Sequence, residues 1–129
     1  MQVTIVGHSL GGGLASLASY ATGFRAVTFN AAGIHDNLIV LNASRYGEVL
    51  TTDEVRAGLA TGDQIRRYVV DGEFLTFLQD RYPNRMPDAL GRRITTEAVP
   101  VRGFGYLRRV NLHFMEAVFR SLDKYYGMD

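Results

Sequence analysis

The sequence GHSLG at Gly7–Gly11 decides the fold of this chain. Before it, the short apolar and β-branched segment Gln2–Val6 predicts a buried strand, and after it the Ala- and Leu-rich segment Leu10–Thr22 predicts a helix. A serine on the sharp turn between a strand and a helix is the context that the G-x-S-x-G pattern requires. The glycine run Gly11–Gly13 costs helix stability, about 0.5–1 kcal/mol per glycine relative to alanine, and close packing is the expected reason.

Each residue of this turn has an expected role. Ser9 is the candidate nucleophile, on a strained backbone that exposes its hydroxyl above the sheet. Gly7 and Gly11 are expected to leave room for the strand and the helix to approach each other. The backbone N–H of Leu10 is expected to face an oxyanion, and the positive end of the helix dipole adds to it. His8 belongs to the motif and is expected to point elsewhere on the turn.

The motif GHSLGG, followed by an Ala/Leu-rich helix, resembles the class 3 lipases and their bacterial phospholipase A1-like relatives, which are α/β-hydrolases. The later segment Phe29–Gly33 resembles the stretch that follows the elbow helix in the bacterial members. The resemblance covers most of the chain and matches the second half of a complete domain. It implies one α/β domain over residues 1–129, with a partial α/β-hydrolase sheet of about three or four mainly parallel strands flanked by helices.

Composition bounds the function. A length of 129 residues suggests one domain, and 47% hydrophobic residues suffice for a packed core. The net charge of +1 gives no electrostatic case for binding nucleic acid, and the absence of cysteine excludes disulfides and thiol catalysis. We expect neither a cofactor nor a metal. No signal peptide is visible, and the sequence leaves open whether the protein acts in the bacterial cytoplasm or is exported.

The remaining chain alternates between strand and helix patterns. A helix between two strands implies a right-handed crossover and a parallel pair. The expected strands are Ala26–Phe29, Ile65–Val70 and Ile94–Val101, and the expected helices are a turn at Asp36–Leu41, a segment capped by Thr51 that runs to about Ala60, Phe74–Gln79 and Val110–Tyr126.

Two of these helices carry apolar positions at helical spacing. In the first helix they are Leu10, Leu14, Leu17, Ala18 and Ala21, and in the last helix they are Leu112, Met115, Phe119, Leu122 and Tyr126.

A serine becomes an effective nucleophile when a base takes its proton and an acid holds that base. In α/β-hydrolases the chain order is serine, acid, histidine. Among the 3 histidines, His35 precedes every plausible acid, whereas His113 follows the last expected strand. His113 also resembles the histidine at the start of the last helix in lipase relatives, which implies that it is the base.

The acid is expected directly after the third strand, where both Asp71 and Glu73 stand. Alignment with lipases places Glu73 where the family usually has aspartate, whereas Asp71 keeps the usual residue type but comes earlier. We favour Glu73 and keep Asp71 as the alternative. One of the two is also expected to cap the helix that follows.

Together these features predict a serine ester hydrolase that acts on lipid or other carboxylic esters through an acyl-enzyme, with transient contact to a lipid surface. The alternative is a catalytically inactive fragment or degenerate relative that serves as a binding or assembly module. The second oxyanion donor normally comes from an earlier loop. An apolar first strand at a sheet edge would pair with a second copy or with a complementing chain. A nucleotide-binding unit is disfavoured, because the glycines do not match G-x-G-x-x-G.

Overall fold

The computed structural model describes residues 2–46 and 50–127. Its centre is a parallel sheet of four strands in the order β1-β2-β3-β4, which confirms the expected α/β class. The strands are β1 (Thr4–His8), β2 (Arg25–Phe29), β3 (Ile65–Val70) and β4 (Arg92–Thr96). The helices are α1 (Leu10–Thr22), α2 (Asp36–Tyr46), α3 (Thr52–Thr61), α4 (Phe74–Arg81), α5 (Gly105–His113) and α6 (Met115–Tyr126).

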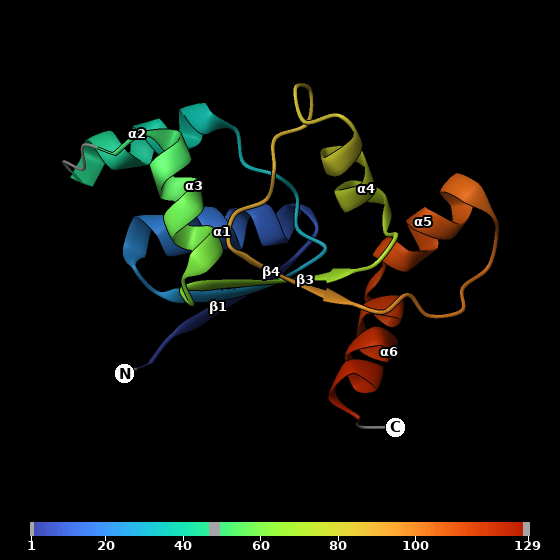
Figure 1. Cartoon of the computed structure of the whole chain (residues 1–129). Coiled ribbons are helices and arrows are strands. Elements are labelled where there is room, and N and C mark those ends of the chain that lie inside the picture. Colours follow the sequence, from blue (N-terminus) through green and yellow to red (C-terminus); the bar gives the residue numbers. More distant parts are fainter. Residues whose placement is uncertain (1, 47–49, 128–129) are drawn as a thin grey trace.

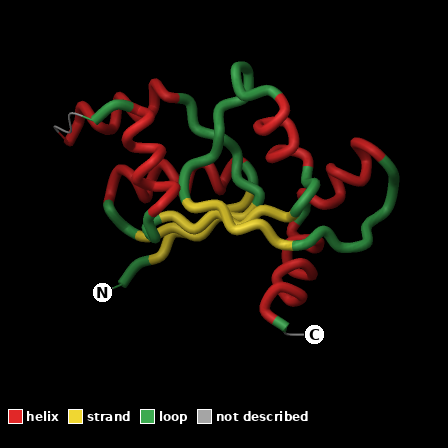
Figure 2. Tube along the Cα trace, viewed as in Figure 1, coloured by secondary structure: helices red, strands yellow, loops and turns green. Residues whose placement is uncertain are grey.

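The helices cover the sheet unequally. Helices α1 to α4 lie on one face, whereas α6 packs against β3 and β4 from the other face (Figure 1). Figure 2 shows the strands side by side, with helices on both sides of the sheet. The core on the first face contains Ala26, Ile34, Ile39, Val55, Leu59, Ile65 and Leu90, and the core under α6 contains Val70, Val99, Leu112, Ala117 and Val118. Within the described part of the chain, no helix has both the length and the apolar character needed to cross a membrane.

The register of the sheet brings three strand ends together. His8 pairs with Phe29, and Phe29 pairs with Tyr68. Because the strands are parallel, the segments that leave their carboxyl ends all start at the same edge of the sheet. The arrows in Figure 1 point toward this edge, where α4 and α5 lie.

Several predicted elements are confirmed. Helix α1 and strand β3 have the predicted bounds, and α3 begins as expected, since the Thr51 side chain accepts the N–H of Glu54 at 3.2 Å. The predicted bounds of three strands are wrong: β1 spans Thr4–His8 instead of Gln2–Val6, β2 begins at Arg25 instead of Ala26, and β4 spans Arg92–Thr96 instead of Ile94–Val101. The turn expected at 36–41 is the longer helix α2.

The single helix predicted at Val110–Tyr126 is wrong, because the chain forms α5 and α6 with a break at Phe114. Phe114 has an extended backbone, with φ −73° and ψ 155°. The carbonyl of His113 accepts side-chain hydrogen bonds from elsewhere in the fold instead of continuing the helix. Local periodicity cannot report such a break.

The apolar positions predicted for α1 are largely outside its buried face. Leu10 and Leu14 are 69% and 61% exposed. The buried side of the helix consists of small residues, Gly12, Gly13, Ala15, Ser16 and Ser19. The Ser16 hydroxyl is satisfied inside the helix by the Gly12 carbonyl at 2.8 Å, so a polar side chain is buried at little cost.

The stripe predicted for the last helix is confirmed in part, because Leu112 belongs to the core under α6 and Met115 and Leu122 pack against it. Phe119 and Tyr126 are 60% and 55% exposed, whereas Ala117, Val118 and Ser121 are buried. Small residues bring this helix close to the sheet, as they do in α1.

The glycines of the elbow differ in what they permit. A Cβ at Gly7 would lie 2.1 Å from the carbonyl oxygen of Gly11, and one at Gly12 would lie 2.8 Å from the Cβ of Ala31. Both positions therefore require glycine. The expected need for space at Gly11 is wrong, because a Cβ there meets nothing within 4 Å.

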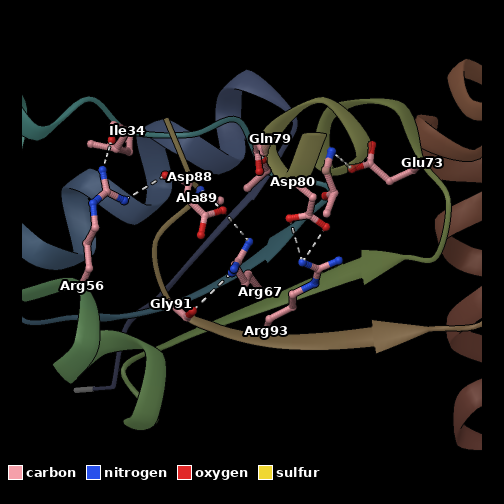
Figure 3. A network of polar contacts seen from close by, with 12 residues as sticks. Ile34, Arg56, Arg67, Glu73, Gln79, Asp80, Asp88, Ala89, Gly91 and Arg93 are labelled. Atoms are coloured by element: carbon pink, nitrogen blue, oxygen red, sulfur yellow. Dashed lines mark hydrogen bonds and ion pairs between the residues drawn. The ribbon is translucent and has the colours of Figure 1, made fainter. Parts of the chain in front are cut away.

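A polar network fastens the loop before β4 to the sheet (Figure 3). The largely buried Arg67 of β3 donates to the carbonyl of Gly91 at 3.2 Å and contacts Asp88 at 3.5 Å, and burial lowers the pKa of Arg67. Near the end of α4, Asp80 pairs with Arg93 of β4 at 3.1 Å. The Asp80–Arg93 pair ties α4 to β4, and Glu73 directly precedes this helix.

Candidate active site

Ser9 occupies a strained turn between β1 and α1. Its backbone has φ 58° and ψ −122°, a conformation that L-residues rarely adopt and that costs of order 1–3 kcal/mol. Three backbone hydrogen bonds hold it: Ser9 N–H donates to Phe29 at 3.1 Å, and its carbonyl accepts from Ala32 at 2.8 Å and from Gly13 at 3.2 Å. The turn is thus fixed by the end of β2 as well as by its own helix.

His113 lies between Ser9 and Glu73. Its Nε2 is 2.8 Å from Ser9 Oγ, and its Nδ1 is 2.6 Å from Glu73 Oε2. It is the last residue of α5, not the start of the final helix as the sequence suggested.

Glu73 is fully buried and also caps α4. Its carboxylate accepts the N–H of Leu75 at 3.1 Å and the N–H of Thr76 at 2.6 Å, and Figure 3 shows it at the start of this helix. Burial by itself raises the pKa of Glu73, but the hydrogen bonds from His113 and Thr76 outweigh burial and hold this pKa below its usual value. Glu73 is therefore held as a carboxylate facing His113.

Asp71, the other candidate acid, lies outside this constellation. Its side chain is exposed, and its backbone N–H donates to the carbonyl of Thr96 at 2.8 Å. The turn after it is held by Arg109, which donates to the carbonyl of Gly72 at 2.9 Å. This turn directs Glu73, not Asp71, toward His113.

Leu10 is the first residue of α1, directly after Ser9. Its N–H belongs to the first helical turn, where backbone donors have no partner inside the helix. This N–H lies at the positive end of the helix dipole, where negative charge is favoured. The Leu10 side chain is 69% exposed and leaves the turn accessible.

Asn30 was not among the expected site residues. It follows β2, is fully buried, and has a left-handed backbone with φ 46°. Its Nδ2 donates to the carbonyls of Leu112 at 3.2 Å and His113 at 3.0 Å, and its Oδ1 accepts the N–H of Val70 at 3.0 Å. A polar residue directly after an apolar strand was the one available signal.

The other two histidines differ in position. The expectation that His8 points elsewhere is wrong, because its Nε2 lies 2.8 Å from the carbonyl oxygen of His113 and the two rings are 5.0 Å apart. His35 is exposed and accepts the N–H of Asn37 at 3.1 Å, away from this constellation. No group of three or more potential metal-ligating side chains occurs among the described residues.

An aromatic cluster lies beside the acid. Phe74 and Phe77 of α4 contact the ring of Tyr106 of α5 edge to face, at centroid distances of 6.3 and 6.1 Å. The guanidinium of Arg109 lies 3.8 Å from the centre of the Phe77 ring. These contacts join the helix that carries Glu73 to the helix that carries His113.

Comparison with known proteins identifies the family that the resemblance suggested. Residues 1–108 match the family described as Phospholipase-like: Tle-like phospholipase domain. This range includes Ser9, Asp71 and Glu73, and His113 follows it. The chain is also 43% identical, over 93 residues, to the extracellular phospholipase A1 of Serratia liquefaciens. The match covers 72% of this chain and 27% of the length of that relative. This chain therefore belongs to the family of Tle-like phospholipase domains.

Proposed function

We propose that this chain carries the catalytic centre of a lipolytic serine ester hydrolase, with Ser9 as nucleophile, His113 as base and Glu73 as acid. One observation carries the proposal. The His113 ring bridges the other two side chains, with 2.8 Å from Nε2 to Ser9 Oγ and 2.6 Å from Nδ1 to Glu73 Oε2. These are the distances that proton transfer and orientation of a base require.

The first half of the reaction acylates the serine. Ser9 Oγ attacks the ester carbonyl carbon while its proton passes to His113 Nε2, and the carboxylate of Glu73 stabilises the resulting imidazolium through Nδ1–H. The tetrahedral intermediate then breaks its bond to the alcohol oxygen. His113 gives its proton to that oxygen, the alcohol leaves, and Ser9 carries the acyl group.

The second half repeats the proton transfers with water. His113 takes a proton from a water molecule while the water oxygen adds to the acyl carbonyl carbon. The bond to Ser9 Oγ breaks, Oγ regains a proton from His113, and the carboxylic acid is released. The chain returns to its starting protonation state, so no further reactant is needed.

The oxyanion of both intermediates faces the N–H of Leu10. In α/β-hydrolases a second N–H comes from a loop on an earlier part of the sheet. Loss of one such donor typically costs about 10²–10³ in rate. The second donor is therefore expected on a segment that lies beside β1.

The edge of β1 is exposed and can bind the segment that carries the second oxyanion donor. Strand β1 pairs only with β2 among the described strands, and Val6, Leu10 and Leu14 are 63%, 69% and 61% exposed. Apolar edge strands pair readily with other strands. The occupant is a second copy of this chain or a complementing chain, and the molecular mass measured by sedimentation at equilibrium distinguishes the two.

The substrate class follows from the relatives, whose descriptions name phospholipases. An acyl ester of a phospholipid is the proposed substrate, and transient contact with a lipid surface is expected. Around the start of α5, Phe104 and Leu107 are 95% and 58% exposed, on the helix that carries His113. Exposed apolar side chains at the start of the helix that ends at His113 suit contact with lipid.

Covalent labelling tests the proposal. A fluorophosphonate should phosphonylate Ser9 Oγ with loss of fluoride, and mass spectrometry should locate the adduct on Ser9. The Ser9→Ala and His113→Gln variants should not be labelled. A folded protein that takes no label, alone or with its partner, contradicts the hydrolase mechanism.

The alternative is a binding or assembly module without turnover, favoured by the exposed edge of β1. It predicts association through β1 together with no hydrolysis of a nitrophenyl ester. Labelling of Ser9 with turnover by the associated form supports the hydrolase, whereas association without either supports the module.

A further inference from the structure

We propose that Asn30 and His8 are positioning residues that hold the main-chain carbonyl of His113 and so fix the base. The proposal rests on the assignment of His113 as the base. Neither residue touches Ser9 Oγ or Glu73 by any recorded hydrogen bond among the described residues, and both act on the peptide group that carries the imidazole.

The carbonyl of His113 needs partners from outside its helix. His113 ends α5, and the last carbonyls of a helix have no acceptor role within it. Two donors reach this oxygen, Asn30 Nδ2 at 3.0 Å and His8 Nε2 at 2.8 Å. With its carbonyl held from two directions, the backbone of His113 is constrained, and contacts with Ser9 and Glu73 orient the ring.

Asn30 also connects the base to the strand that leads to the acid. Its Oδ1 accepts the N–H of Val70, the last residue of β3, while its Nδ2 donates to Leu112 and His113. The side chain is fully buried and all of its recorded bonds go to backbone atoms. One amide thus joins the ends of β2 and β3 to the end of α5, so a shift of either strand end is transmitted to His113.

His8 acts from the opposite side of the motif. Because a carbonyl oxygen only accepts, the contact at 2.8 Å requires a proton on His8 Nε2. His8 directly precedes Ser9 in the chain. The neighbour of the proposed nucleophile therefore also holds the backbone of the proposed base. A small displacement of a catalytic group can cost on the order of 100-fold in rate, which makes such double support useful.

Three variants test the proposal. Asn30→Gly removes the amide, and glycine adopts the left-handed φ of 46° at this position without strain. His8→Leu removes the donor, whereas His8→Gln keeps an N–H at a similar reach. His35→Gln is the matched control, because it changes an exposed histidine outside the site.

Two readouts follow the base. The first is the rate at which a fluorophosphonate labels Ser9. The second is the downfield proton resonance of His113 Hδ1, which a short bond from Nδ1 to Glu73 at 2.6 Å produces and which needs no reaction at Ser9. We expect Asn30→Gly and His8→Leu to slow labelling by about 10- to 100-fold and to broaden or shift the resonance. We expect His8→Gln to restore most of the rate lost in His8→Leu, and His35→Gln to match the unmodified chain.

The outcomes separate this inference from the proposed function. If the unmodified chain is not labelled but Asn30→Gly and His8→Leu both displace the His113 resonance, the hydrolase mechanism fails. The positioning of His113 by Asn30 and His8 then still holds. If Asn30→Gly and His8→Leu fold and leave both the rate and the resonance unchanged, the positioning is overturned. If Asn30→Gly does not fold, His8→Leu and His8→Gln decide, and equal effects of these two overturn the role of the His8 donor.

Discussion

The carboxyl ends of the strands and the outer edge of β1 and α1 differ in how far their side chains are buried and hydrogen-bonded. At the carboxyl ends of the strands, the buried side chains of Asn30 and Glu73 each make several hydrogen bonds within the chain. Along the outer edge of β1 and α1, Val6, Leu10 and Leu14 remain more than half exposed. The chain therefore satisfies the buried side chains of Asn30 and Glu73 by itself, while it leaves an apolar surface exposed beside them.

This difference predicts where substitutions act. A buried polar group that loses its partner costs about 1–3 kcal/mol, so changes at the strand ends are expected to alter both stability and chemistry. An exposed apolar side chain contributes little to the stability of the separate chain, because little of its area is removed from water. Changes along the outer edge are expected to alter association, and turnover through it, while they leave the stability of the separate chain nearly unchanged.

The largest expected effect is that of Ser9→Ala on turnover. Removal of a catalytic serine typically lowers the rate by on the order of 10⁶-fold, because the covalent route is lost. The measurement is hydrolysis of a nitrophenyl ester by the associated form, with His35→Gln as the control. Turnover in Ser9→Ala close to that of the control would remove Ser9 from the mechanism.

Gly7→Ala tests the close packing under the site. The new Cβ would lie 2.1 Å from the carbonyl oxygen of Gly11, and we expect a loss of about 3 kcal/mol in the free energy of unfolding. The matched control is Gly11→Ala, where the Cβ meets open space and alanine favours the helix, so we expect a gain of about 0.5–1 kcal/mol. Urea unfolding measures both, and equal effects would contradict the packing argument.

Glu73→Gln tests the buried carboxylate. We expect the free energy of unfolding to fall by about 2 kcal/mol near neutral pH, because the charge-assisted hydrogen bonds from His113 and Thr76 are weakened. The folded-state pKa of Glu73 is below its ordinary value of 4.5, so its stabilisation is complete above that value and is lost as the pH falls through the lowered pKa.

The difference in stability between the unmodified chain and Glu73→Gln should therefore narrow on acidification. Thermal unfolding from pH 7 to pH 3 measures it, and Asp71→Asn is the control, since the Asp71 side chain is exposed. A difference that stays constant over this range would show that the Glu73 carboxylate is not stabilised by folding.

Val6→Lys tests the outer edge of β1 and has the smallest expected effect on the stability of the separate chain. Because Val6 is 63% exposed, we expect the free energy of unfolding to change by less than about 0.5 kcal/mol. Association along β1 should be lost, because a charge on an edge strand opposes pairing. Leu41→Lys, on an exposed position of α2, is the control. Unchanged association in Val6→Lys would exclude β1 as the contact.

The site prediction rests on one motif, on chain order and on the resemblance to lipases. GHSLG predicted a strand-to-helix turn at Ser9, and the order serine, acid, histidine together with the lipase resemblance favoured His113 as the base. The bounds of α1 and β3 followed from local apolar patterns. These features are local, because the backbone periodicity and the turn residues lie within a few positions of one another.

The sequence by itself determined the parallel α/β sheet, the strained serine turn and the candidates for the base and the acid. Alignment with lipases favoured Glu73 over Asp71, and the structure places Glu73, and not Asp71, against His113. Tertiary structure alone decided that Asn30 and His8 hold the His113 carbonyl. It also decided that α1 buries its small residues and exposes Leu10 and Leu14. The physical reason is that hydrophobic spacing encodes local conformation, whereas the direction of a side chain after a turn and the face that a helix buries depend on how closely distant segments approach.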